Sequence, residues 1–285
     1  MTPLSYELRA LLDTEPVDLA RAALVIAKLE YPRLDPTTSL AALAELGDRA
    51  AVRLRPWGEA SVRARITALN QLLYEDENFA GNHDHYDDFR NSLLNLVIER
   101  RLGIPISLGV IYIEVARRAG LDVQGIAFPG HFLLRVPTGS PMPDAAGGAV
   151  ILDPFDGGAE VDERRCRSML VRQLGKRARF DPRLLDPCTP RELVSRMINN
   201  LKRTYVDQRS FPQAWSATDL LLAIDPTAHA EVRDRGLLAY QLDDFPSALR
   251  DLEEYLSLEP GASDDRRDEI MEHVRTLRRR VASLN

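Results

Sequence analysis

An internal repeat in the last third of the chain limits the fold more than any other feature. The run Phe211-Pro212-x-Ala214 recurs as Phe245-Pro246-x-Ala248. The same offset pairs Leu222 with Leu256, Ile224 with Leu258, Asp225 with Glu259 and Pro226 with Pro260. We interpret each copy as part of one antiparallel helix pair, in which the small alanine lets two helices approach closely and the proline ends the unit.

The offset between the copies matches the ~34-residue period of the tetratricopeptide repeat. Residues 190–285 are therefore predicted to be an all-α, tetratricopeptide-type region that ends in a charged capping helix from Asp264 to Leu284. Such arrays bind extended or helical peptides in a groove, so a peptide or protein partner is expected. The alternative is a set of ordinary amphipathic helices whose period is a coincidence.

The first part of the chain, from residue 4 to 75, is also predicted to be helical. Apolar residues recur at helical spacing from Leu19 to Leu29 and again from Gly58 to Leu73. Between these segments, Thr38 or Ser39 is suited to cap a further helix.

The middle of the chain changes from helices to strands. One helix is expected to end near Gly103, and the next to run from Ser107 to Ala119. Three strands should follow, with a loop from Thr138 to Gly148 between the last two: Leu121–Phe128, Phe132–Val136 and Ala149–Leu152. Helices followed by a run of strands are typical of an α+β fold and not of a doubly wound sheet.

The charge balance limits the kinds of partner. The chain has 37 basic and 43 acidic residues and a net charge of −6, which argues against a nucleic-acid partner because such proteins usually carry a concentrated basic face. A solvated helix face is favoured over a binding patch for one basic cluster, which comprises Arg164, Arg165, Arg167, Arg172, Lys176, Arg177 and Arg179. The apolar runs are far shorter than the ~20 residues of a membrane-spanning helix, so no membrane contact is expected.

Cysteine usage indicates a reducing compartment. Cys166 and Cys188 are too few for a disulfide framework and lack the spacing of metal ligands. The N-terminus has no apolar run of signal-peptide type, so a cytoplasmic protein is predicted. No cofactor or metal is expected.

Three polar residues stand at the ends of the central elements. Ser107 is expected at the start of a helix, His131 before a strand, and Asp153 at the end of the next strand. A nucleophile at a helix N-terminus, with a histidine and a carboxylate on neighbouring strands, matches the geometry of a catalytic triad. The helix start would also supply backbone N–H donors for a developing oxyanion.

These residues lie in motifs that resemble a known family. The motifs are Asn91-Ser92-Leu93-Leu94, Gly103-Ile104-Pro105-Ile106-Ser107-Leu108, Glu114-Val115-Ala116-Arg117-Arg118, Pro129-Gly130-His131-Phe132 and Asp153-Pro154-Phe155-Asp156-Gly157-Gly158. Together they are similar to the SirB-type family of bacterial proteins. The resemblance implies a papain-like transglutaminase core with N-terminal helices over residues 1–185, followed by tetratricopeptide repeats over residues 190–285.

The resemblance also implies site residues. Active transglutaminase-like enzymes use cysteine, histidine and aspartate in that chain order, so by position Ser107 replaces the cysteine, His131 matches the histidine and Asp153 the aspartate. A serine hydroxyl has too high a pKa for the thiolate route of such enzymes. Serine is also among the best helix caps, so Ser107 is interpreted either as a cap or as a nucleophile.

Two functions stay open at this point. The first is a non-catalytic peptide-interaction or regulatory protein that uses the core cleft and the repeat groove. The second is a serine-dependent amide or ester hydrolase, or an acyltransferase. The mouth of the cleft is expected to include His83, His85 and Asp156 as binding residues, and the oligomeric state is left open.

Overall fold

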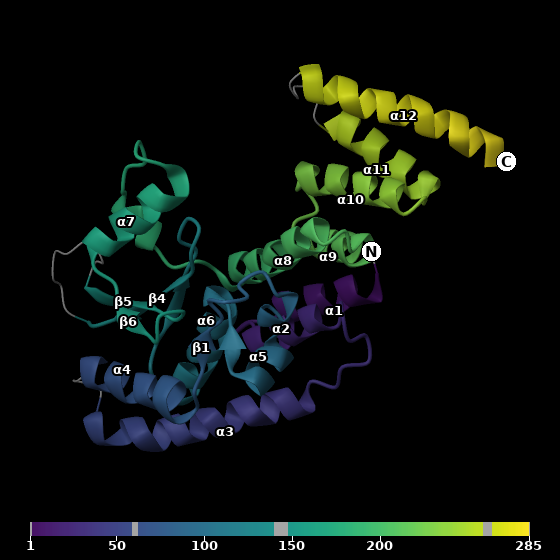
Figure 1. Ribbon diagram of the computed structural model, residues 1–285. Coiled ribbons are helices and arrows are strands. Elements are labelled where there is room, and N and C mark those ends of the chain that lie inside the picture. The colour runs from purple at the N-terminus through teal and green to yellow at the C-terminus, as the bar shows by residue number, and fades with distance from the viewer. Residues whose placement is uncertain (1, 59–61, 140–147, 259–263, 285) are drawn as a thin grey trace.

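The computed structural model describes residues 2–58, 62–139, 148–258 and 264–284 (Figure 1). Its N-terminal part is helical, as predicted, and is formed by α1 (Pro3–Leu12), α2 (Leu19–Ala27), α3 (Thr37–Leu54), the 3₁₀ turn η1 (Arg55–Trp57), α4 (Val62–Asn70) and the π-helical turn η2 (Gln71–Asp76).

The start of α3 differs from the prediction. The helix begins at Thr37, and neither Thr38 nor Ser39 is its cap. The carboxylate of Asp35 accepts hydrogen bonds from the backbone N–H and the hydroxyl of Thr37, so the turn forms one step earlier. The start of the helix predicted from Gly58 to Leu73 lies partly outside the described residues, which do not include 59–61.

Helices α5 (Leu94–Arg100) and α6 (Pro105–Arg118) occupy the centre of the fold, and the 3₁₀ turn η3 (Phe89–Asn91) precedes them. Helix α6 begins two residues before Ser107, so the predicted start at Ser107 is wrong. Proline is favoured at the first helical position, where no backbone donor is needed, and this allows Pro105 to open the helix. Two short strands were not predicted: β1 (Ala80–Gly81) pairs in parallel with β2 (Leu102–Gly103).

A four-stranded antiparallel sheet follows, in the order β3 (Gln124–Ile126), β4 (Leu133–Pro137), β5 (Ala149–Asp153) and β6 (Ala159–Glu160). The first three strands were predicted, with β3 shorter than expected, whereas β6 was missed because it has two residues. The predicted loop from Thr138 to Gly148 lies largely outside the described residues.

Both faces of the sheet are covered, which explains the apolar runs in its strands. Leu134 and Leu152 face one side and join the main core with α6, whereas Leu133 and Ile151 face the other side. That second side packs against α7 (Glu163–Leu174) and the 3₁₀ turn η4 (Pro182–Leu185). Figure 1 shows the strands and α7 grouped at one end of the molecule.

The C-terminal region is helical, as the repeat predicted: α8 (Pro190–Asp207), α9 (Phe211–Ile224), α10 (His229–Gln241), α11 (Phe245–Leu258) and α12 (Asp264–Leu284). Ala214 and Ala248 are both fully buried, and Phe211 and Phe245 both open their helices in half-buried positions. These equivalent environments agree with the repeat. Glu259 and Pro260, which belong to the same alignment, lie outside the described residues.

The first helix pair of the repeat region is packed into the main core. One hydrophobic cluster includes Leu8 of α1, Leu24 of α2, Val194 of α8 and Leu220 of α9. A separate cluster joins α10, α11 and α12 through Val232, Leu252, Ile270 and their neighbours. Figure 1 shows α1 beside α9, whereas α10 to α12 extend away from the core.

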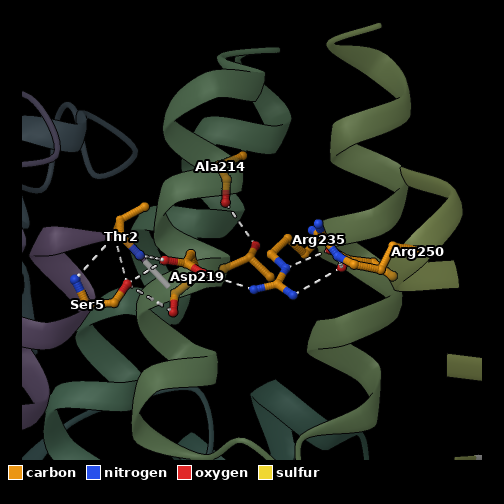
Figure 2. Close-up of polar contacts among 8 residues, drawn as sticks. Thr2, Ser5, Ala214, Asp219, Arg235 and Arg250 are labelled. Atoms are coloured by element: carbon orange, nitrogen blue, oxygen red, sulfur yellow. Dashed lines mark hydrogen bonds and ion pairs between the residues drawn. The ribbon is translucent and has the colours of Figure 1, made fainter. Parts of the chain in front are cut away.

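A buried polar network connects α1 to α9, and α9 to α10 and α11 (Figure 2). Asp219 of α9 accepts hydrogen bonds from the Ser5 hydroxyl and, at 2.9 Å, from the backbone N–H of Thr2. The guanidinium of Arg235 on α10 donates to Asp219 at 2.9 Å and to Asp251 of α11 at 2.7 Å. The two carboxylates are fully buried, so their charges depend on these partners.

The described part of the chain contains no helix that is long and apolar enough to cross a membrane.

Candidate functional site

His131 and Asp153 form the central polar contact of the core. The His131 Nε2 atom and the Asp153 Oδ1 atom are 2.9 Å apart. Antiparallel pairing of β4 with β5 causes this contact, because His131 lies just before β4 and Asp153 ends β5. With Nε2 bonded to the carboxylate, no described residue forms a hydrogen bond with Nδ1 of the same ring.

The Asp153 carboxylate is held from several sides. It also accepts a hydrogen bond from the backbone N–H of Phe155 at 3.0 Å, and Arg165 Nη2 lies 3.4 Å from its second oxygen. Burial raises the pKa of this carboxyl, but the hydrogen bonds from His131 and Phe155 and the charges of His131 and Arg165 together outweigh burial, and the pKa lies below its ordinary value of 3.8. Asp153 is therefore an anion that orients the imidazole at neutral pH.

The turn after β5 is fixed by the helical layer beneath it. The Tyr74 hydroxyl donates to the Pro154 carbonyl at 3.1 Å, and the Asn70 amide donates to the Gly158 carbonyl at 2.9 Å. Asn70 in turn accepts a hydrogen bond from Tyr112 of α6. These bonds place the Asp153 turn against α4 and the π-helical turn η2.

A residue of α8 holds the His131 loop. The guanidinium of Arg196, on α8, donates to the carbonyls of Phe128 (2.7 Å) and His131. On the other side, Phe132 packs against α6, where a Cβ atom at Gly109 would lie 2.5 Å from the Phe132 ring. The imidazole is thus positioned by α6 and α8 together.

The pair lies at a cavity of about 480 Å³. Side chains from the loop before α5, from the turn after β5 and from α7 line it, among them His83, Phe155, Met169, Arg172 and Gln173. The Phe155 ring stands between two histidines, with ring centroids 4.3 Å from His83 and 6.4 Å from His131. A cavity of this volume can receive a side chain or a short peptide segment.

Ser107 does not line this cavity and forms no hydrogen bond with His131. Its hydroxyl, which is fully buried, accepts a hydrogen bond from the backbone N–H of Ile104 at 3.1 Å and lies 2.6 Å from the carbonyl of Asn91, to which it donates. A Cβ atom at Gly103 would lie 2.7 Å from the same oxygen. In this structure the hydroxyl ties the start of α6 to the preceding segment.

Asn91 connects that contact to the mouth of the cavity. Its buried amide donates to the carbonyl of His85 at 2.7 Å and accepts a hydrogen bond from Asn82 at 3.0 Å. This fixes the loop that carries His83 and His85. Of the predicted binding residues, His83 and Asp156 line the cavity, whereas His85 does not. Asp156 forms an ion pair with Arg165 at 2.7 Å.

Both cysteines are free thiols. Burial raises the pKa of Cys166 and that of Cys188 to about 11. At neutral pH they are therefore protonated and poorly nucleophilic.

Several residues at the site were not predicted. Arg165 and Arg172 belong to the basic cluster noted in the sequence, and their spacing of seven places both on the cavity side of α7. Phe155 stands in the motif that supplied Asp153. No sequence pattern marks Arg196 as a site residue, because its bonds to the Phe128 and His131 carbonyls depend on how α8 packs against the sheet.

Comparisons with known proteins agree with this two-part organisation. A profile of the transglutaminase-like superfamily matches residues 37–199, and a tetratricopeptide-repeat profile matches residues 201–279. The chain is 37% identical to a "UPF0162 protein" of Xylella fastidiosa over 258 residues, which cover 88% of each chain. It is 29% identical to a "UPF0162 protein" of Vibrio cholerae over 86% of this chain and 87% of that one.

A more distant relative is "F-box only protein 21" of Homo sapiens, which is 30% identical over 172 residues. Those residues cover 56% of this chain and 25% of the human protein. No solved structure was found to match the chain.

Proposed function

Since the chain belongs to the transglutaminase-like superfamily and continues into tetratricopeptide repeats, we propose that it binds a peptide or protein partner and is not a catalyst. The partner enters the cavity beside His131 and Asp153, and the adjoining repeat helices extend the contact. The observation that carries this proposal is the buried Ser107 hydroxyl, which bonds to two backbone groups and not to the imidazole.

A serine nucleophile needs a base that takes its proton, and it needs access to the substrate. The Ser107 proton points to the Asn91 carbonyl, and the side chain has no exposed surface. His131 and Asp153 keep their mutual bond in an open cavity, where they supply a hydrogen-bonding wall. That arrangement suits recognition of polar peptide groups.

The remaining predictions from the sequence form part of the same proposal. We place the family within the SirB-type group and the protein in the cytoplasm, where two unpaired cysteines are expected. We divide the chain into residues 1–185, with the cleft, and residues 190–285, with the repeats.

The catalytic part of the proposal is tested by measuring turnover. Purified protein is incubated with p-nitrophenyl acetate, with a glutamine peptide plus an amine, and with a fluorophosphonate probe. We expect no activity above that of His131→Ala and no labelling of Ser107. Ester or amide turnover that disappears in both Ser107→Ala and His131→Ala, but persists in the exposed-serine control Ser168→Ala, would establish the hydrolase instead.

The binding part is tested by selecting peptides from a random display library on the full chain. Enriched peptides should lose affinity when Gln173→Trp fills the cavity. Val171→Trp is the matched control, because Val171 lies on the same helix, is 38% exposed and does not line the cavity. A selection that yields no peptide, or peptides equally sensitive to both variants, would refute the proposed role of the cavity.

A further inference from the structure

Helix α7 and the turn after it carry a basic surface that the site described above leaves unexplained. Between residues 172 and 179 four residues are basic and none is acidic: Arg172, Lys176, Arg177 and Arg179, which we call the basic rim. All four are exposed, and none forms an ion pair or a side-chain hydrogen bond with any described residue. The whole chain has a net charge of −6, so the basic rim is a positively charged segment of a negatively charged protein.

The basic rim begins at the cavity. Arg172 and Gln173 line the cavity, and Lys176 follows four residues after Arg172, in the turn after α7 ends at Leu174. Two other arginines of the helix are already neutralised: Arg165 pairs with Asp156, and Arg167 pairs with Glu163. Arg164 has no ion pair among the described residues, but it lies at the start of α7 and does not line the cavity. Unpaired positive charge therefore gathers at the edge where the cavity opens.

Positive charge also acts on Tyr86, in the loop before α5. Arg203 of α8 is exposed and has no ion pair among the described residues. Burial raises the pKa of Tyr86, and the charges of Arg203 and Arg196 act against that rise. The Tyr86 ring contacts Phe155 of the cavity at a centroid distance of 5.7 Å.

The apolar groups beside the basic rim limit the kind of ligand that can bind there. Leu174 is 61% exposed between Arg172 and Lys176, and Met169 and Phe155 line the cavity beside them. A ligand that satisfies both features needs negative charges and at least one large apolar side chain. An acidic peptide segment has both.

A nucleic acid fits less well. Its phosphates carry closely spaced charge along the whole backbone. The cavity lining includes Asp156, and the loop that carries His83 also carries the exposed Asp84 and Asp87, so a continuous polyanion would meet carboxylates. A peptide can place its acidic residues on the basic rim and its other residues against the mouth.

We propose that the basic rim and the cavity together bind an acidic peptide segment of a partner protein, with an apolar side chain of that segment in the cavity. The inference rests on the proposed binding function and adds the chemistry of the partner. Charge attraction between exposed groups weakens with salt, so the affinity should fall as ionic strength rises.

The probe is a fluorescein-labelled peptide of glutamate and alanine with one central phenylalanine, and its binding is measured by fluorescence anisotropy. The double variant Arg172→Glu/Lys176→Glu should weaken binding about tenfold, which corresponds to about 1.4 kcal/mol. The matched control Arg33→Glu/Arg55→Glu makes the same change in net charge at exposed arginines outside the surface and should bind as wild type does.

Three outcomes would overturn the inference. One is equal binding of a peptide with glutamine in place of glutamate. Another is an equal loss in the two double variants. The third is a single-stranded oligonucleotide that displaces the peptide and binds more tightly.

The inference and the proposed function can fail separately. Neutral peptides that emerge from display selection and depend on the cavity would refute the acidic partner while the binding function stands. If no peptide binds in either experiment, both are refuted.

Discussion

Replacing Arg235 by methionine should destabilise the repeat region strongly. The substitution keeps much of the apolar stem of the side chain but removes the cation between Asp219 and Asp251. Both carboxylates are fully buried, and removing one partner of a buried ion pair costs about 3–5 kcal/mol. Ser5 and Thr2 still donate to Asp219, so we expect a loss near the lower end, about 3 kcal/mol.

The structure offers a matched control on the same carboxylate. Arg250 also contacts Asp251, at 3.2 Å, but its side chain is 63% exposed, whereas that of Arg235 is 14% exposed. Exposed ion pairs contribute about 0–1 kcal/mol, so Arg250→Met should cost less than about 1 kcal/mol.

Urea denaturation, followed by the fluorescence of Trp215 in α9 and by circular dichroism, measures both variants. Equal losses in the two variants, or a loss below about 1 kcal/mol for Arg235→Met, would refute the argument that burial makes this ion pair important.

Further predictions concern the core. Ser107→Ala should cost about 2 kcal/mol in thermal or urea unfolding, because two buried backbone groups lose their partner, whereas the control Ser168→Ala, at an exposed site, should have almost no effect. Iodoacetamide should leave Cys166 and Cys188 unmodified in the native protein at neutral pH, as mass spectrometry can show, and fast alkylation of either would contradict their raised pKa. The pKa of Asp153 is lowered in the folded state, so its contribution to stability is present above the unfolded pKa of about 3.9 and is lost as the pH falls through the folded value. A carboxyl ¹³C NMR titration with an Asp153 midpoint above 3.8 would contradict this.

The repeat region could be predicted from the sequence because its signal is periodic. Matching alanines at 214 and 248 predict matching close contacts, and both are fully buried. Three of the four strands of the sheet, β3, β4 and β5, were also predicted, since they are short apolar runs between turn residues. Strands β1, β2 and β6 were missed because each has two residues, which are too few to show the alternation of polar and apolar residues that marks a strand.

The candidate site was predictable in part. Antiparallel strands that follow one another along the chain bring their neighbouring ends together, so the contact between His131 and Asp153 could be expected. The direction of the Ser107 side chain could not, because it depends on the Asn91 carbonyl, which is brought there by the packing of η3 against α5, β2 and α8. The bond from Arg196 to the His131 loop is a contact between distant segments and likewise has no local pattern.

The packing of α8 and α9 into the main core affects how the chain divides into independent parts. The hydrophobic cluster that contains α1, α2 and α6 also contains Val194 and Leu220, and Arg196 reaches from α8 to the loop beside the cavity. A chain shortened at residue 190 would expose that apolar surface and release the His131 loop. The connection between α9 and α10 is not a clean boundary either, because Leu222 of α9 belongs to the cluster of α10 to α12 and Arg235 of α10 bonds to Asp219 of α9. Helix α8 therefore supports the His131 loop of the core as well as packing against α9, the helix that follows it.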